Sequence, residues 1–170
     1  MVFFSSNDWI SLVFRLFLSL LSGFVIGINR QRSGKPAGLR TFMIVSLGSA
    51  LFVMIPLQAE SDAGYASSNA LSRTIQGVAS GVGFLGAGII LQQSHRELNK
   101  IEVKGLTSAA TIWLAAGLGV AAGCGLWRMV LLGLVCALGT LSGVKRIKQT
   151  KHWLFYRYPK SDRQEIGEKV

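Results

Sequence analysis

Five long apolar stretches that contain no Asp or Glu dominate this sequence between Trp9 and Val144. They cover residues 9–28, 39–57, 75–91, 106–122 and 126–144. Each is close to the roughly 20 residues that a helix needs to cross the apolar core of a bilayer. The sequence therefore predicts an all-α integral membrane protein: residues 1–144 form a bundle of five transmembrane helices, and residues 145–170 form a tail.

The lack of carboxylates in these stretches narrows the function. Proton relays and metal-ion pathways within bilayers usually depend on acidic side chains, because little else can hold a bare cation there. His95 and His152 fall outside the apolar stretches, and no catalytic, phosphate-binding or metal-binding motif occurs. We therefore expect neither an ion pump nor an enzyme, and no cofactor or metal site. Cys124 and Cys136 are too far apart on one helix to form a disulfide.

The formal charge of +10 predicts a topology, not binding of nucleic acid. Of the 18 Lys and Arg residues, 15 fall in the first loop, the third loop and the tail, which share one side if the spans alternate. By the positive-inside rule that side is the cytoplasm, so we expect the N-terminus outside and the C-terminus inside. The tail interleaves basic with aromatic residues, which favours its lying on anionic lipid at the cytoplasmic face. Docking to a partner is the alternative.

Small residues recur along the spans and predict close helix packing. In the first span they follow one another at i+4 with an arginine among them: Ser11, Arg15, Ser19, Gly23 and Gly27. The fourth span repeats the pattern with Ala115, Gly119 and Gly123, and the third contains Gly81, Gly83 and Gly86 among other glycines. Because close backbone approach drives helix association in lipid, we expect these stripes to face protein. Gly83→Leu is then expected to disrupt folding or assembly.

Two segments carry a similar Gly-Leu-polar-polar entry into a span. Gly38-Leu39-Arg40-Thr41 opens the second span, and Gly105-Leu106-Thr107-Ser108 opens the fourth. Each follows a basic loop, so Lys35, Arg40 and Lys104 lie beside a helix N-terminus, and Pro36 suits a first helical turn. One interpretation is a site for a phosphate, an anionic lipid headgroup or an acidic partner. The other is that Arg30 and these charges set topology alone.

Arg15 lies about two turns into the first span, where a charge costs at least about 2.5 kcal/mol at the membrane centre. It either snorkels to the outer interface or is buried. If buried, its partners are expected among helix carbonyls or the outer-side acids Asp8, Glu60 and Asp62.

Three blocks of the sequence resemble the signature blocks of the MgtC/SapB family of bacterial inner-membrane proteins. These are residues 29–41 (NRQRSGKPAGLRT), 73–91 (RTIQGVASGVGFLGAGIIL) and 103–123 (VKGLTSAATIWLAAGLGVAAG). The resemblance covers about residues 15–144 and implies a five-span bundle in the inner (plasma) membrane. The family commonly has acidic residues where this chain has Asn29-Arg30-Gln31. Many members append a cytoplasmic domain, and regulation through such a domain is not expected here.

The resemblance also implies a function. The family is associated with growth under magnesium limitation and, in pathogens, with virulence through survival inside macrophages. Its members are thought to modulate membrane energetics, including inhibition of the ATP synthase, without carrying magnesium themselves. We therefore expect a non-enzymatic protein that acts on ion homeostasis through contacts with a membrane protein such as the ATP synthase, with a homo-oligomer also possible. A transporter or channel for an ion or small anionic solute is the alternative.

Overall fold

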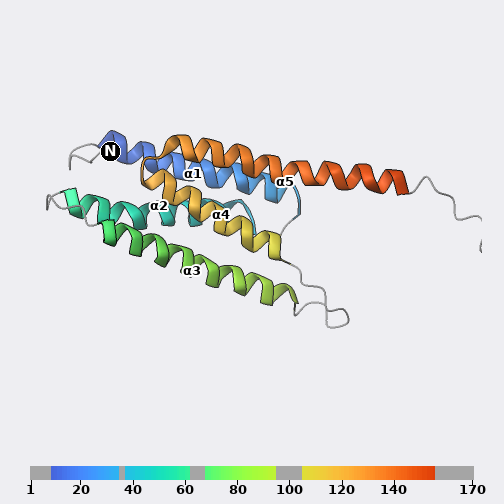
Figure 1. The fold of residues 1–170 in the computed structure, drawn as a ribbon, viewed down its shortest axis with the longest axis horizontal. Helices are drawn as coiled ribbons and strands as arrows, with labels where there is room; N and C mark the ends of the chain where they lie inside the picture. The colour runs from blue at the N-terminus through green and yellow to red at the C-terminus, as the bar shows by residue number, and fades with distance from the viewer. Residues whose placement is uncertain (1–8, 35–36, 62–67, 95–104, 156–170) are drawn as a thin grey trace, which may run out of the picture.

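The computed structural model describes residues 9–34, 37–61, 68–94 and 105–155, and every regular element within them is an α-helix. The helices are α1 (Trp9–Gln31), α2 (Leu39–Ser61), α3 (Ser68–Ser94), α4 (Leu106–Gly123) and α5 (Trp127–Phe155). They run alternately in opposite directions (Figure 1), so that α1 and α3 end where α2 and α4 begin. We call this the basic end of the bundle because Arg30, Arg32 and Arg40 belong to it.

Four helices contain segments long and apolar enough to cross a membrane: Trp9–Gln31, Leu39–Ala59, Asn69–Gln92 and Leu106–Gly123. The apolar part of α5, Trp127–Gly143, is shorter. The predicted all-helical bundle is thus confirmed for the described residues.

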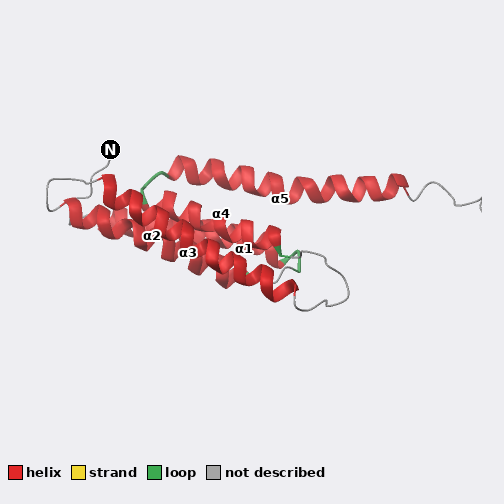
Figure 2. Ribbon diagram, turned by 60° about the horizontal axis from the view of Figure 1, so that its bottom comes forward, coloured by secondary structure: helices red, strands yellow, loops and turns green. Residues whose placement is uncertain are grey.

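Helix α4 lies at the centre of the arrangement. It contacts each of the other four helices, whereas α1 and α3 do not contact each other and α5 contacts only α1 and α4. Figure 2 shows α5 alongside the group formed by α1 to α4. The central position of α4 explains why most of its residues are buried and why small side chains, Ala115, Gly119 and Ala122 among them, make up so much of it.

Glycines bring α1, α2 and α4 together at backbone distance. A Cβ atom added at Gly23 would lie 2.7 Å from Cα of Met43, and one at Gly123 would lie 2.9 Å from Cα of Ala50. At Gly119 the added atom would overlap the backbone carbonyl of Ser46. These contacts confirm that the small-residue stripes of the first and fourth spans face protein. They are the close approaches by which helices associate in a membrane.

The interior is apolar and so is much of the surface. Ile26, Phe42, Val53 and Ile112 are almost fully buried. Other large apolar side chains point outward along the helices, including Phe14, Phe17, Phe52, Phe84, Trp113, Leu132 and Val135. A bundle in water rarely exposes such a surface, whereas lipid tails would cover it without cost.

Most helices extend beyond the predicted apolar stretches, and α3 begins seven residues earlier than predicted, at Ser68. Two of the differences bear on the site and the tail. Helix α1 continues past residue 28 to Gln31, which draws Arg30 into the helix. Helix α5 does not end at Val144 but runs on to Phe155, because Val144 to Phe155 contain neither Gly nor Pro to interrupt it. The predicted tail is therefore helical in its first part, and residues 156–170 lie outside the described residues.

Candidate functional site

Two arginines lie on the buried face of α1, fifteen positions apart. Arg15 is 4% exposed and Arg30 is 3% exposed. Both side chains reach α4, but at opposite ends of it: Arg15 contacts its C-terminus and Arg30 its first turn. A guanidinium remains charged in proteins and needs several hydrogen-bond acceptors. Each buried arginine must therefore find acceptors for its N–H groups inside the bundle.

Arg15 completes the C-terminal cap of α4. Gly125 adopts a left-handed conformation with φ 77°, and the N–H groups of Gly125 and Leu126 donate to the carbonyls of Ala122 and Ala121. This is the Schellman arrangement of helix ends. The Gly123 carbonyl accepts a 2.8 Å hydrogen bond from Nη1 of Arg15. The cation therefore lies at the negative end of the helix dipole, where it is favoured.

This contact decides between the two interpretations of Arg15. The side chain is buried and does not snorkel, and one of its acceptors is a helix carbonyl, as the second interpretation required. Asp8 and Asp62 lie outside the described residues, as does the side chain of Glu60.

Position 125 requires glycine for two reasons, its backbone conformation and the space taken by Arg15. Its positive φ disfavours any residue with a side chain, and a Cβ atom there would lie 2.9 Å from Cζ of Arg15. The neighbouring residue Cys124 is half buried. Burial raises the pKa of the Cys124 thiol, and the positive charge of Arg15 offsets part of that rise.

Arg30 meets α4 at its other end. Its Nη2 donates a 2.8 Å hydrogen bond to Oγ of Ser108, in the first turn of α4. That turn follows Gly105, which has φ 95° and provides no side-chain cap. Nε of Arg30 is buried and has no hydrogen-bond partner. The sequence interpretation of Arg30 as a loop charge that sets topology is therefore wrong in its placement, since the side chain is inside the bundle.

Buried serines connect α1 and α2 between the two arginines. Oγ of Ser46 donates to the carbonyl of Ser19 at 2.7 Å, and Oγ of Ser22 donates to the same carbonyl at 2.8 Å. The two hydroxyls also lie 3.0 Å apart. These bonds satisfy polar groups on the small-residue stripe without interrupting the close packing around Gly23.

The structure brings only some of the other residues of the predicted anion site close to a helix N-terminus. Gly38 and Gly105 immediately precede α2 and α4, as predicted, but only Gly105 has a positive φ. Arg40, Thr41 and Thr107 are exposed. Lys35, Pro36 and Lys104 lie outside the described residues. Ser108, which sequence reasoning did not single out as a site residue, is the one that contacts a buried cation.

The three glycines predicted to pack closely in the third span differ in what they meet. Gly81 and Gly83 are exposed, and a Cβ atom at either would meet nothing within 4 Å. Gly86 alone of the three is buried, with an added Cβ 3.2 Å from Cβ of Ala109. Within the described chain, the predicted close helix contact is present at Gly86 and absent at Gly81 and Gly83, and contact with another chain stays a prediction. The reason is that α3 contacts only α2 and α4, so most of its surface faces outward.

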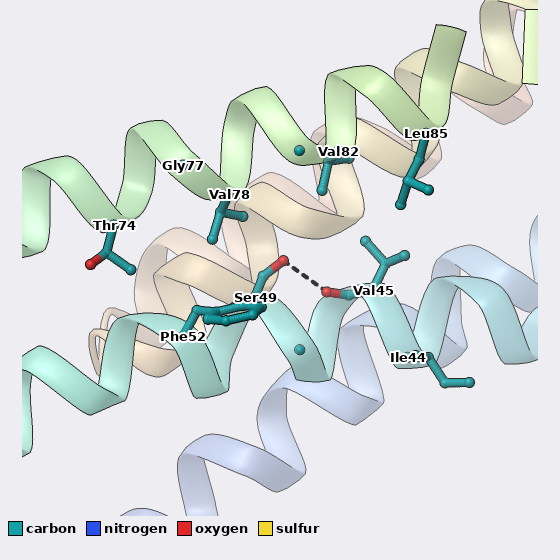
Figure 3. Close-up of a pocket in the computed structure, with 11 residues that line it drawn as sticks. Ile44, Val45, Ser49, Phe52, Thr74, Gly77, Val78, Val82 and Leu85 are labelled. Atoms are coloured by element: carbon teal, nitrogen blue, oxygen red, sulfur yellow. Dashed lines mark hydrogen bonds between the residues drawn. The ribbon is translucent and has the colours of Figure 1, made fainter. Parts of the chain in front are cut away.

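A groove of about 630 Å³ opens between α2 and α3 (Figure 3). It is lined mainly by aliphatic, aromatic and glycine residues: Ile44, Val45, Gly48, Ser49, Phe52, Thr74, Gly77, Val78, Gly81, Val82 and Leu85. The Ser49 hydroxyl turns back to its own helix and donates to the Val45 carbonyl at 2.8 Å. Gly81, one of the glycines expected to face protein, lines this groove.

These features define a multi-pass helical membrane protein, with apolar outer surfaces and two arginines enclosed at the ends of its central helix. The chain belongs to the MgtC family, which matches residues 16–150. The sequence resemblance is thus confirmed.

Three relatives show how far the likeness extends. Protein SrpB of Synechococcus elongatus is 56% identical over 90% of this chain and 85% of its own length. YhiD of Escherichia coli strain K12 is 37% identical over 74% of this chain and 57% of its own. Protein MgtC of Salmonella typhimurium strain LT2 is 33% identical over 74% of this chain and 49% of its own. The chain therefore spans about half the length of YhiD and MgtC. No solved structure matches it.

Proposed function

We propose that this protein modulates ion homeostasis and membrane energetics by contacting another membrane protein, as an adaptation to low magnesium, and that it neither catalyses a reaction nor carries an ion. Membership of the MgtC family and the name of the relative YhiD, which describes a proposed magnesium transporter, support the connection with magnesium. The ATP synthase is the candidate partner that the family resemblance suggests. The proposed location is the bacterial inner membrane.

The observation that carries the proposal is the contrast between the centre of the bundle and its side. The centre is closed by backbone contacts, as at Gly23 and Gly119. The side is open where α2 and α3 form the apolar groove, and Gly77 and Gly81 line it. A groove lined by glycine permits the close approach of another helix, which is how transmembrane helices associate. We therefore propose that a transmembrane helix of the partner occupies the groove.

A transporter remains the second candidate, because the name of YhiD describes a proposed magnesium transporter. Among the described residues, no three His, Cys, Asp or Glu side chains form a group that could hold a metal ion. The two candidates differ in whether the chain alone moves an ion.

The proposal includes a topology that can be tested directly. We expect five spans with the N-terminus outside and the basic end in the cytoplasm, because 15 of the 18 basic residues belong to that side. In a background lacking Cys124 and Cys136, a membrane-impermeant thiol reagent should label Lys160→Cys only after the cells are opened. Labelling of intact cells at this position would overturn the topology.

Filling the groove tests the partner contact. Gly81→Leu should leave the fold intact, since nothing lies within 4 Å of an added Cβ, but should exclude a partner helix. ATP-driven proton pumping in inverted vesicles should fall when the wild-type chain is present and should be restored by Gly81→Leu. Gly83→Leu is the matched control, because Gly83 is exposed on the same helix without lining the groove.

Two outcomes would contradict this function. Equal effects of wild type and Gly81→Leu on pumping would remove the groove from the mechanism. Movement of magnesium or another ion into proteoliposomes that contain the purified chain alone would favour the transporter. Crosslinking from Phe52, which lines the groove, identifies the occupant and separates a partner helix from a second copy of the chain.

A further inference from the structure

Arg30 carries a buried positive charge for which no anionic partner is present among the described residues. Its side chain is 3% exposed, its Nη2 donates to the neutral hydroxyl of Ser108, and its Nε has no partner. The described helices contain a single acidic residue, Glu60, which lies in the last turn of α2 at the opposite end of the bundle. A buried guanidinium without a counter-charge is costly, since burial removes its hydration.

Arg15 and Arg30 lie at opposite ends of the α4 dipole. Arg15 lies at the C-terminus of α4, where the dipole is negative, and donates to the Gly123 carbonyl. Arg30 lies at the N-terminus of the same helix, where the dipole is positive and repels a cation. Arg30 also belongs to the last turn of α1, whose dipole favours it, so the two helix ends oppose each other. Neither provides an acceptor for Nε.

The first turn of α4 offers further donors at the same place. Its first intrahelical bond runs from the N–H of Ala109 to the carbonyl of Gly105, so the preceding N–H groups of the turn have no acceptor within the helix. Gly105, the N-cap residue, has no side chain with which to cap them. Oγ of Ser108 accepts from Arg30, which leaves its hydroxyl proton available to donate. A helix start whose N-cap residue provides no side-chain cap and a buried guanidinium whose Nε has no hydrogen-bond partner therefore meet at one point.

We propose that a phosphate group binds at this junction of Arg30 and the first turn of α4. Phosphate oxygens would accept from the Arg30 guanidinium, from the Ser108 hydroxyl and from the backbone N–H groups of the turn. Arginine and helix N-termini are the two donor types that proteins commonly combine around phosphate. A phosphate would supply the counter-charge that the described residues do not provide, cap α4 and give Nε an acceptor.

The described residues around the junction leave room for such a ligand to approach. Gly105 is half buried and has no side chain to block the turn, and Thr107 beside it is exposed. Arg32 and Arg40, at the same end of the bundle, are exposed and raise the local concentration of anions. The phosphate can belong to a lipid headgroup or to a soluble molecule, because both present the same oxygens.

The test compares the thermal stability of the purified full chain with and without phosphate. In neutral detergent, saturating inorganic phosphate should raise the Tm by at least about 3 °C relative to chloride at equal ionic strength, because binding to the folded state stabilises it. Arg30→Gln should abolish this rise. Arg15→Gln is the matched control: it removes the other buried arginine of α1 and should keep the phosphate response even though its starting Tm is lower.

A second variant keeps the test decisive if Arg30→Gln does not fold. Arg30→Lys retains the charge but lacks Nε and the planar fork, so it should weaken the apparent phosphate affinity at least about tenfold. A second arm replaces detergent by nanodiscs. A rise in Tm when phosphatidylglycerol is added to phosphatidylcholine discs identifies a lipid headgroup, and a rise with inorganic phosphate in phosphatidylcholine discs identifies a soluble ligand.

Two results would overturn the proposal. One is the absence of any response to inorganic phosphate and to phosphatidylglycerol, or a response that Arg30→Gln retains in full. The other concerns the acidic residues Glu97 and Glu102, which belong to the segment before α4. If Glu97→Gln or Glu102→Gln lowers the Tm as much as Arg30→Gln does, and phosphate has no effect on the wild type, then a carboxylate of the chain itself neutralises Arg30.

Discussion

Gly119→Leu should prevent the chain from reaching its native fold. A Cβ atom at this position would overlap the carbonyl oxygen of Ser46 and lie 2.9 Å from its Cα. Both groups are backbone atoms of packed helices, so no side-chain rotation relieves the clash and α2 must move away from α4. Overpacking costs about 1–3 kcal/mol where side chains can yield, and we expect the upper part of that range or more here. The measurement is the yield and Tm of monodisperse protein after extraction in mild detergent.

Gly83→Leu provides the control for the Gly119 experiment. The chemical change is the same, but Gly83 is exposed and open to its surroundings in the single chain. Replacing glycine within a helix also improves helix propensity by up to about 1 kcal/mol. This variant should accumulate normally with an unchanged or slightly raised Tm. Normal yield and Tm for Gly119→Leu would show that the contact between α2 and α4 is looser than its backbone distances imply.

These two glycines also show what the sequence could and could not predict. A small residue at every fourth position predicts that some face of a helix packs closely, but it does not say whether the partner belongs to the same chain. In α4, which is surrounded by four helices, Gly119 and Gly123 meet backbone of α2. In α3, which has two neighbours, Gly81 and Gly83 meet none. The difference depends on the position of each helix in the bundle. The hydropathy of the sequence carries no information about that position.

The placement of Arg30 was missed for a more local reason. The first apolar stretch ends at Ile28, so a boundary based on hydropathy assigns Arg30 to the loop. The helix continues to Gln31, and Arg30 lies four residues after Ile26 and eight after Ser22, both of which are buried. Extending the helix by one turn would have placed Arg30 on the face of those two residues. Its hydrogen bond to Ser108 could not be found this way, because it joins positions 78 residues apart.

Arg15→Lys should destabilise the protein, although a side chain that only snorkelled would tolerate the exchange. Arg15 is 4% exposed, and its Nη1 donates to the carbonyl of Gly123 at the end of α4. Lysine has a compact ammonium without the planar fork, so it cannot keep several directed bonds in the same place. Arg15→Gln removes the charge as well and leaves the Gly123 carbonyl without its donor. We expect the larger loss for glutamine, about 3 kcal/mol, and a smaller loss for lysine.

Arg128→Gln is the matched control for the substitution of Arg15. Arg128 lies near the same end of the bundle but is exposed, with its guanidinium 5.2 Å from the ring centre of Trp127. Its loss should change the free energy of unfolding by no more than about 0.5 kcal/mol. Titration with a denaturing detergent, followed by near-UV circular dichroism, measures all three variants. Equal midpoints for wild type and Arg15→Lys would mean that charge alone matters at this position.

Gly125→Ala tests the same contact from the other side. Its Cβ would lie 2.9 Å from Cζ of Arg15, and the positive φ of Gly125 adds backbone strain of about 1 kcal/mol. If the Arg15 guanidinium stabilises the end of α4, then Gly125→Ala, which displaces the guanidinium, and Arg15→Gln, which removes it, disturb the same hydrogen bond. The double variant Arg15→Gln/Gly125→Ala should then be less destabilised than the sum of the two single variants, because the clash disappears with the arginine. Strict additivity would show that Gly125 acts only through its backbone conformation and that Arg15 is not part of the cap.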